Sequence, residues 1–267
     1  MKALEDAEQF THASRIFDDW IALVDVSLAA LPAHVEAAMA DRTLAADTPE
    51  TAALFKRIMV FYRDRAAHVI RYFALALGTL LDVAHEHTQT NEYRDVIGDV
   101  YMRLNAAKSR AGQYFTPWNL ARMIADMTIA DGERRVMERL LHGNPLWLLL
   151  SGKDPAPVPF EPVTVHDPAC GSGALLLAAA TRFPRWMLTR GLVQFSGVDI
   201  DATCVTMARI NMRLYGLNGT VTETLQALQR GRTRAVDRIN SELSMLPHSA
   251  GPVTARGRDN TKREKAR

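Results

Sequence analysis

Between a β-branched run and a run of alanines and leucines, this chain reads Asp167-Pro168-Ala169-Cys170-Gly171-Ser172-Gly173. The run at residues 163–165 predicts a buried strand, and residues 174–180 predict a helix. Gly171 and Gly173 leave out side chains where a backbone must approach a ligand closely. The pattern is typical of a nucleotide-binding strand-turn-helix, with the ligand at the carboxyl end of the strand and against the helix N-terminus.

A second strand is predicted at residues 193–198, followed by a helix over residues 202–215, and a short third strand fits residues 220–224. Asp199 ends the second strand, where an acidic side chain can accept hydrogen bonds from both ribose hydroxyls of an adenosine. Asp201 is expected to cap the helix that follows. This order of elements predicts a Rossmann-like α/β domain.

Three domains are predicted along the chain. Residues 1–107 carry helical periodicity with almost no strand signal, which indicates a helical domain. Residues 108–228 form the Rossmann-like cofactor-binding domain, and a proline-rich linker at 152–162 leads into its first strand. Residues 229–267 are expected to form a C-terminal helix and a basic tail.

The composition is that of a soluble globular protein with a net charge of +2. Two cysteines, Cys170 and Cys204, disfavour a disulfide framework or a thiolate metal site. Residues 230–267 carry 10 basic and 4 acidic side chains. Such a tail attracts polyanions, and both a solvated end and a nucleic-acid contact stay open.

A cytoplasmic location without membrane contact is expected. The apolar run at residues 73–81 is about half of the roughly 20 residues that span a bilayer. Charged residues near the N-terminus do not fit a signal peptide. The group Asp82, His85, Glu86 and His87 has metal-compatible spacing, but helix capping and solvation explain it better, so no metal site is predicted.

Upstream of the glycine turn lies the segment Gly112-Gln113-Tyr114-Phe115-Thr116-Pro117, with a helix predicted over residues 118–127 and Thr116 as its cap. The chain thus contains, in this order, a helical region, this segment, the glycine turn and a strand that ends in an acid. This order of elements resembles that of the adenine-specific (N6) DNA methyltransferases of the gamma arrangement. The resemblance is strongest to methylase subunits of type I restriction-modification systems. It extends over residues 93–216.

The resemblance implies S-adenosylmethionine as the cofactor. A sulfonium ligand that also bears a carboxylate suits a pocket with amide donors on one side and carboxylates on the other. The family places the segment before Trp118 near the methionine end, the glycine turn around the amino-acid part and the acid of the second strand on the ribose. The implied cofactor-binding residues are Tyr114, Phe115, Thr116, Pro117, Asp167, Pro168, Ala169, Gly171, Gly173 and Asp199.

The base pocket of the family is not found in the sequence, and the catalytic residues stay unknown. These enzymes hold the adenine amine with an Asn/Asp-Pro-Pro-aromatic segment after the fourth strand, and this chain has no Pro-Pro pair. The nearest match, Asn144-Pro145-Leu146-Trp147, precedes the glycine turn and reads as a helix start. The residues after Gly216 hold at most one strand and one helix, so the sheet is expected to be shortened in its C-terminal half. The open edge of the first strand then needs a cover.

Two functions from different classes follow from these patterns. The first is a site-specific, adenine-specific DNA methyltransferase of the restriction-modification type, with DNA as the substrate partner. The alternative is a cofactor-binding but catalytically incomplete subunit or remnant that needs a partner chain for the base pocket. A specificity or catalytic subunit is the kind of partner chain expected. A nucleotide-binding oxidoreductase is disfavoured because Leu176 replaces the third glycine of Gly-x-Gly-x-x-Gly.

Overall fold

The computed structural model describes residues 13–40, 48–105, 115–142, 148, 150–152 and 160–224. The chain separates into two compact units, Met1–Ala227 and Leu228–Arg267, and every described residue belongs to the first. The predictions for Tyr114, for residues 144–147 and for the C-terminal helix and tail lie outside the described residues. The three-part division of the chain stays a prediction.

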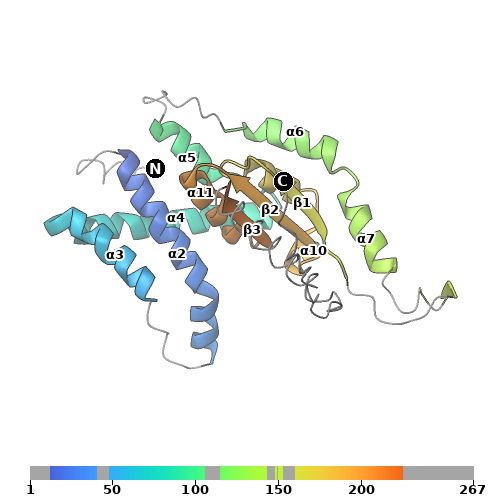
Figure 1. Ribbon diagram of the computed structural model, residues 1–267, viewed down its shortest axis with the longest axis horizontal. Helices are drawn as coiled ribbons and strands as arrows, with labels where there is room; N and C mark the ends of the chain where they lie inside the picture. Colours follow the sequence, from blue (N-terminus) through green and yellow to red (C-terminus); the bar gives the residue numbers. More distant parts are fainter. Residues whose placement is uncertain are drawn as a thin grey trace, which may run out of the picture. The chain divides into compact units, whose positions relative to one another are not determined.

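The described part of the chain contains a parallel sheet of three strands in the order β1-β2-β3 (Figure 1). The strands are β1 (Val163–Asp167), β2 (Val193–Asp199) and β3 (Gly219–Glu223). The register pairs Val165 with Phe195 and Phe195 with Gly219. Helical crossovers join each strand to the next, and this confirms the predicted Rossmann-like α/β arrangement.

The crossovers are formed by helices that the sequence predicted closely. α9 (Ala174–Ala180) and α10 (Arg185–Thr189) join β1 to β2, and α11 (Ala202–Leu214) joins β2 to β3. Asp201 caps α11, because its carboxylate accepts a hydrogen bond of 2.8 Å from the Thr203 amide. The core between the sheet and these helices is apolar, with Leu176, Leu177, Phe183, Met187, Phe195 and Ala208 all less than 2% exposed.

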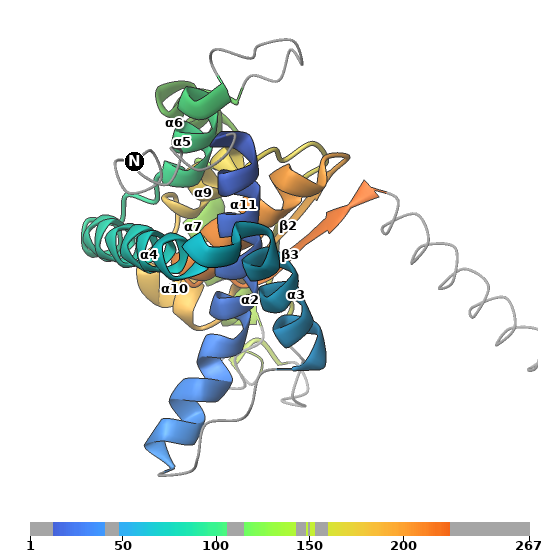
Figure 2. The ribbon, with the colours of Figure 1, turned by 90° about the vertical axis from the view of Figure 1, so that its left-hand side faces the viewer.

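The N-terminal region is helical, as predicted, and it packs on the sheet domain through α11. Trp20 and Phe73 lie in one apolar cluster with Met207 and Ile210 of α11. The longest helix of the N-terminal region, α2 (Ala13–Met39), lies against α11 (Figure 2). The other elements of this region are α3 (Pro49–Tyr62), the 3-10 turn η1 (Arg63–Arg65), α4 (Ala66–Gln89) and α5 (Val96–Asn105).

Two stretches of this region, Arg15–Met39 and Pro49–Gln89, are long and apolar enough to cross a membrane by length and composition alone. Core helices of soluble proteins pass the same test, and Trp20 and Phe73 are at most 5% exposed here. The finding therefore does not decide between a core and a membrane role. The cytoplasmic location and the absence of membrane contact stay predictions.

α6 (Trp118–Thr128) and α7 (Gly132–His142) form the remaining layer beside α9 and β1. The prediction that Thr116 caps α6 was wrong, since Pro117 occupies the cap position and no side chain caps the helix. A proline forces the residue before it into an extended conformation. That geometry leaves the Thr116 hydroxyl one residue outside the position from which a side chain reaches the first helical amides.

Gly219 offers a test of the β2-β3 pairing. A Cβ at this position would lie 1.8 Å from the carbonyl oxygen of Phe195 and 2.9 Å from Cε of Met212. The Gly219→Ala variant must separate the two strands, so its free energy of unfolding should fall by about 3 kcal/mol or more. Urea unfolding followed by circular dichroism measures this change.

The matched control is Gly78→Ala in the exposed part of α4, where a Cβ meets nothing within 4 Å. This variant should gain about 0.5–1 kcal/mol because alanine favours a helix. Equal stabilities of Gly219→Ala and the wild type would show that the pairing of β2 with β3 is incorrect.

Candidate cofactor site

The glycine turn crosses the carboxyl ends of β1 and β2. The Cys170 amide donates to the Val198 carbonyl at 2.9 Å, and the Gly173 amide donates to the Cys170 carbonyl at 2.8 Å. Gly171 has a φ of +54° and Gly173 a φ of +91°. An L side chain is strained at both positions, so the path of the turn requires these two glycines.

Asp199 faces the glycine turn from the end of β2. One carboxylate oxygen accepts from the Gly171 amide at 2.8 Å, and the other accepts from the Asp201 amide at 2.9 Å. An ionised carboxylate has about four lone-pair sites, so each oxygen keeps acceptor capacity. The side chain is half-buried. Asp199 can thus hold the turn and accept hydroxyl groups of a ligand at the same time.

Asp167 ends β1, and its two carboxylate oxygens differ in their hydrogen bonding among the described residues. Oδ1 accepts from the Ala169 amide at 3.0 Å, which fixes the start of the turn. Oδ2 is buried and accepts no hydrogen bond within the described part of the chain. A buried carboxylate oxygen without a donor is unfavourable, so this atom calls for a donor or a cation from a ligand. Pro168 and Ala169, which follow, are exposed.

The segment before α6 reaches the same turn through Phe115. The Phe115 ring lies 3.3 Å from the point where a Cβ on Gly171 would stand, and it stacks on Tyr101 of α5 at a centroid distance of 5.5 Å. Thr116 is half-buried and Pro117 is exposed. The structure therefore brings together Phe115, Asp167, Gly171 and Asp199, which are far apart in the sequence.

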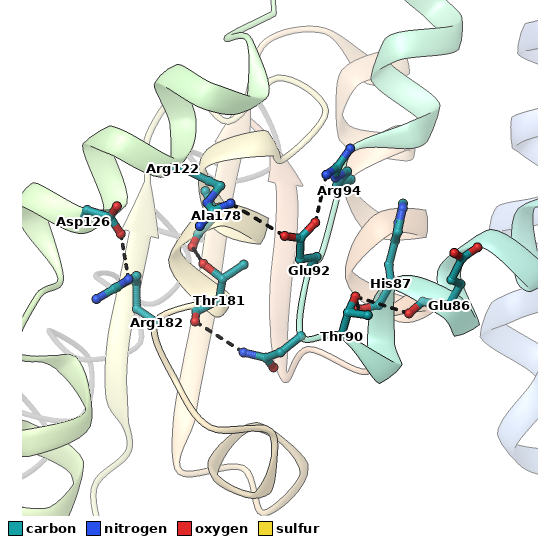
Figure 3. Close-up of polar contacts among 11 residues, drawn as sticks. Glu86, His87, Thr90, Glu92, Arg94, Arg122, Asp126, Ala178, Thr181 and Arg182 are labelled. Atoms are coloured by element: carbon teal, nitrogen blue, oxygen red, sulfur yellow. Dashed lines mark hydrogen bonds and ion pairs between the residues drawn. The ribbon is translucent and has the colours of Figure 1, made fainter.

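α6 is held in place beside the turn by small side chains and ion pairs. Ala121 and Ala125 pack against Ala178 of α9 in one apolar cluster. Figure 3 shows the ion pairs at the surface of this contact, where Asp126 meets Arg182 at 2.8 Å. Because α6 begins directly after Pro117, these contacts also position Phe115.

Cys170 is a packing residue of the turn. Burial and the carboxylates of Asp167 and Asp199 raise the pKa of its thiol to about 12. A thiol with that pKa is protonated at neutral pH and is a poor nucleophile. Gly197 makes room for it, since a Cβ there would lie 2.9 Å from the Cys170 sulfur. Sequence reasoning missed Gly197, although a glycine two residues before a strand-ending acid is a usable signal.

Sequence reasoning also missed a buried polar cluster behind the turn. Oδ2 of Asp95 accepts from the Ser172 hydroxyl, and its Oδ1 accepts from the Gly98 amide at 2.8 Å and from Nδ2 of Asn211 at 2.7 Å. Asn211 also donates to the Ser172 carbonyl at 2.9 Å. An aspartate before α5 signals a helix cap, but nothing in the local sequence connects it to a turn 77 residues further on.

The fold and site define a Rossmann-like domain in which a glycine turn and two strand-ending acids, Asp167 and Asp199, meet at the carboxyl ends of β1 and β2. A family model described as N-6 DNA Methylase matches residues 92–243, more than half of the chain. The chain belongs to the N-6 DNA methylase family, which confirms the predicted family.

Among solved structures, the chain is similar to a Listeria monocytogenes protein assigned to the class I S-adenosylmethionine-dependent methyltransferases. The identity is 14% and the TM-score 0.29, over 78% of this chain and 52% of that one. The chain thus spans about half the length of this neighbour.

Family membership implies S-adenosylmethionine as the cofactor, as predicted, and the residues present fit it. Oδ2 of Asp167, which accepts no hydrogen bond from the described residues, could receive the ammonium group of the cofactor, and the Asp199 carboxylate could receive its ribose hydroxyls. The described residues contain no group of three His, Cys, Asp or Glu side chains that could hold a metal ion.

The buried carboxylate of Asp95 predicts a pH-dependent stability. Burial raises its pKa to about 6, above the ordinary 3.8, while the hydrogen bonds from Ser172, Gly98 and Asn211 lower it and Asp99 raises it further. Burial raises the pKa of Cys204 in α11 and of Tyr215, which follows α11, and the charge of Asp95 raises both further. The contribution of Asp95 to stability is therefore present below pH 4 and lost as the pH rises through 6.

The Asp95→Asn variant removes this titration. Its free energy of unfolding, relative to the wild type, should rise by up to about 3 kcal/mol between pH 4 and pH 7. Urea unfolding at a series of pH values measures the difference. The exposed Asp82 on α4 provides the control Asp82→Asn, which should track the wild type because Asp82 does not shift the pKa of Asp95. A flat difference for Asp95→Asn would show that Asp95 is not a buried charge.

Proposed function

We propose that this chain is an S-adenosylmethionine-dependent DNA methyltransferase that modifies the N6 amino group of adenine in a restriction-modification system. The observation that carries the proposal is the meeting of Asp167, Gly171 and Asp199 at one strand edge, in a chain whose residues 92–243 match the N-6 DNA methylase family. The cofactor supplies an electrophilic methyl group on a sulfonium centre.

In this proposal the residues of the chain bind and orient the two substrates. The Oδ2 atom of Asp167 receives the ammonium group of the cofactor, and Asp199 receives the ribose hydroxyls. Phe115 closes the turn on the side of α5. The adenine pocket has no assigned residue within the described ranges, so no catalytic residue is named. DNA as the partner is supported by the family description and by the basic composition of residues 230–267.

The direct test is the transfer of labelled methyl groups to unmethylated DNA by the purified chain, followed by digestion to nucleosides. Labelled N6-methyladenine is the expected product. The Asp199→Ala variant should lose the product and bind the cofactor about 100-fold more weakly, because it loses charge-assisted hydrogen bonds both to the ligand and to the turn.

Asp82→Ala is the matched control for this variant, since Asp82 is an exposed acid on α4. It should bind cofactor and transfer methyl groups like the wild type. A wild-type chain that binds no S-adenosylmethionine in calorimetry would overturn the proposed function.

A second candidate function, a subunit that completes its base pocket with a partner chain, is supported by the outer edge of β1. Within the described sheet, β1 pairs only with β2. A cavity of about 250 Å³ lies along that edge between β1, α6 and α9. Its lining is mainly apolar, with Val165, Leu175 and Leu176 among the residues, and it extends to Asp167 and Pro168 of the candidate cofactor site. A parallel strand normally has a neighbour on each side and covered faces, so this edge favours an additional strand.

The methyl-transfer assay also separates the two candidate functions. Cofactor binding without methyl transfer by the chain alone would support the partner-dependent subunit. Formation of N6-methyladenine by the chain alone would contradict it and would support the complete enzyme.

A further inference from the structure

The connection between α4 and α5, residues 91–95, lies along α9; we call it the strap. Its first residue meets the end of α9, where Nδ2 of Asn91 donates to the Thr181 carbonyl at 3.4 Å. Its last residue, Asp95, accepts from the Ser172 hydroxyl just before α9 begins. The four residue steps from Asn91 to Asp95, at about 3.3 Å each, can reach about 13 Å. This reach is slightly more than the length of the seven-residue helix α9, which is roughly 10 Å. The strap therefore spans the whole of α9.

The middle of the strap is anchored in the core of the sheet domain. The Tyr93 side chain is fully buried and its ring packs on Tyr215 at a centroid distance of 5.3 Å. The Tyr215 hydroxyl donates to the Arg94 carbonyl at 2.7 Å, and the Tyr93 hydroxyl donates to Asn91 at 2.6 Å. The strap is thus fixed at both ends and at its centre, and its position is well defined against α9 and α11.

The glycine turn needs an external contact to hold one conformation. Ser172 lies between Gly171 and Gly173, which both have positive φ values and can rotate with little penalty. The Ser172 side chain is 1% exposed, and its hydroxyl and carbonyl are held by Asp95 and Asn211. A shift of Ser172 would move the Gly171 amide away from Asp199 and change the site.

The choice of aspartate at position 95 fits a positioning role. Three donors point at this side chain, from Ser172, Gly98 and Asn211, and a carboxylate can accept from all three. An asparagine oxygen could still accept from Gly98 and Asn211, but its amino group would donate to the Ser172 hydroxyl. The bond to the turn would then be reversed and would lose its charge. A buried carboxylate lowers stability compared with a neutral group, so stability alone does not explain the residue.

We propose that Asp95 is a positioning residue of the cofactor site, which holds the glycine turn from outside the pocket and couples cofactor binding to the docking of the strap and α5. The proposal rests on the cofactor site described above and adds a residue and a coupling to it. Coupling between two sites is reciprocal. Cofactor binding should therefore stabilise the strap and the start of α5, which contact the turn at Ser172.

The first experiment measures the dissociation constant of S-adenosylmethionine by calorimetry for the full chain, for Asp95→Asn and for the control Asp99→Asn. At pH 7.5, Asp95→Asn should bind about tenfold more weakly because one charge-assisted hydrogen bond to the turn is lost. The exposed Asp99→Asn variant should stay within about twofold of the wild type, since no contact to the turn changes.

The pH profile separates positioning from a general effect on folding. Wild-type affinity should fall as the pH is lowered from 7.5 to 5.5, because protonation of Asp95 removes one acceptor. The affinity of Asp95→Asn should not change over this range. Equal affinities and equal pH profiles for the two proteins would overturn the positioning role while leaving the cofactor site intact.

The second experiment uses the wild-type chain alone. It tests the coupling between cofactor binding and the strap even if the Asp95→Asn variant fails to fold. Hydrogen exchange is followed with and without S-adenosylhomocysteine. The amides of residues 96–99, including the Gly98 amide that donates to Asp95, should exchange more slowly when the ligand is bound. The amides of α3, which is outside this network, should not change.

The outcomes distinguish the coupling to the strap from the cofactor site itself. Protection confined to the glycine turn would overturn the coupling to the strap, even with a working cofactor site. Failure of the wild-type chain to bind either ligand would overturn the cofactor site and, with it, the role of Asp95.

Discussion

The hydrogen bond between the Gly171 amide and the Asp199 carboxylate is the contact on which the candidate site depends. The parallel register pairs Asp167 with Gly197, so β2 continues two residues further to bring Asp199 opposite the glycine turn. The contact joins the first crossover to the end of the second strand. It also leaves the free oxygen of Asp167 and the carboxylate of Asp199 on one edge of the sheet, where one ligand can meet both.

Most of the sheet domain could be predicted from sequence because its signals are local. The bounds of α9, the strand ending in Asp199 and the cap at Asp201 each depend on residues within a few positions of one another. The exception among local signals is Thr116, where the following proline takes the cap position. The link from Asp95 to Ser172 could not be predicted, since it depends on tertiary packing across 77 residues.

Two of the four buried side-chain polar atoms without hydrogen-bond partners among the described residues lie beside the same turn. Oδ2 of Asp167 and Oδ1 of Asn211 are buried and accept no hydrogen bond from the described residues. Asp95, between them and the helical region, is a buried carboxylate with a raised pKa. Proteins rarely keep such groups for stability, and they are concentrated where binding or catalysis requires them. Their position behind and beside the glycine turn supports this turn as the candidate functional site of the described fold.

α6 connects the cofactor site to the open edge of β1. Its alanines allow close packing on α9, and its first turn follows directly from Phe115 and Pro117 beside the glycine turn. The same face of this helix, further along at Ile124 and Thr128, lines the cavity along β1. A strand or chain that filled this cavity would therefore press on the helix that positions Phe115. An added strand at the edge of β1 would thus change the geometry of the candidate cofactor site through one helix, the eleven-residue α6.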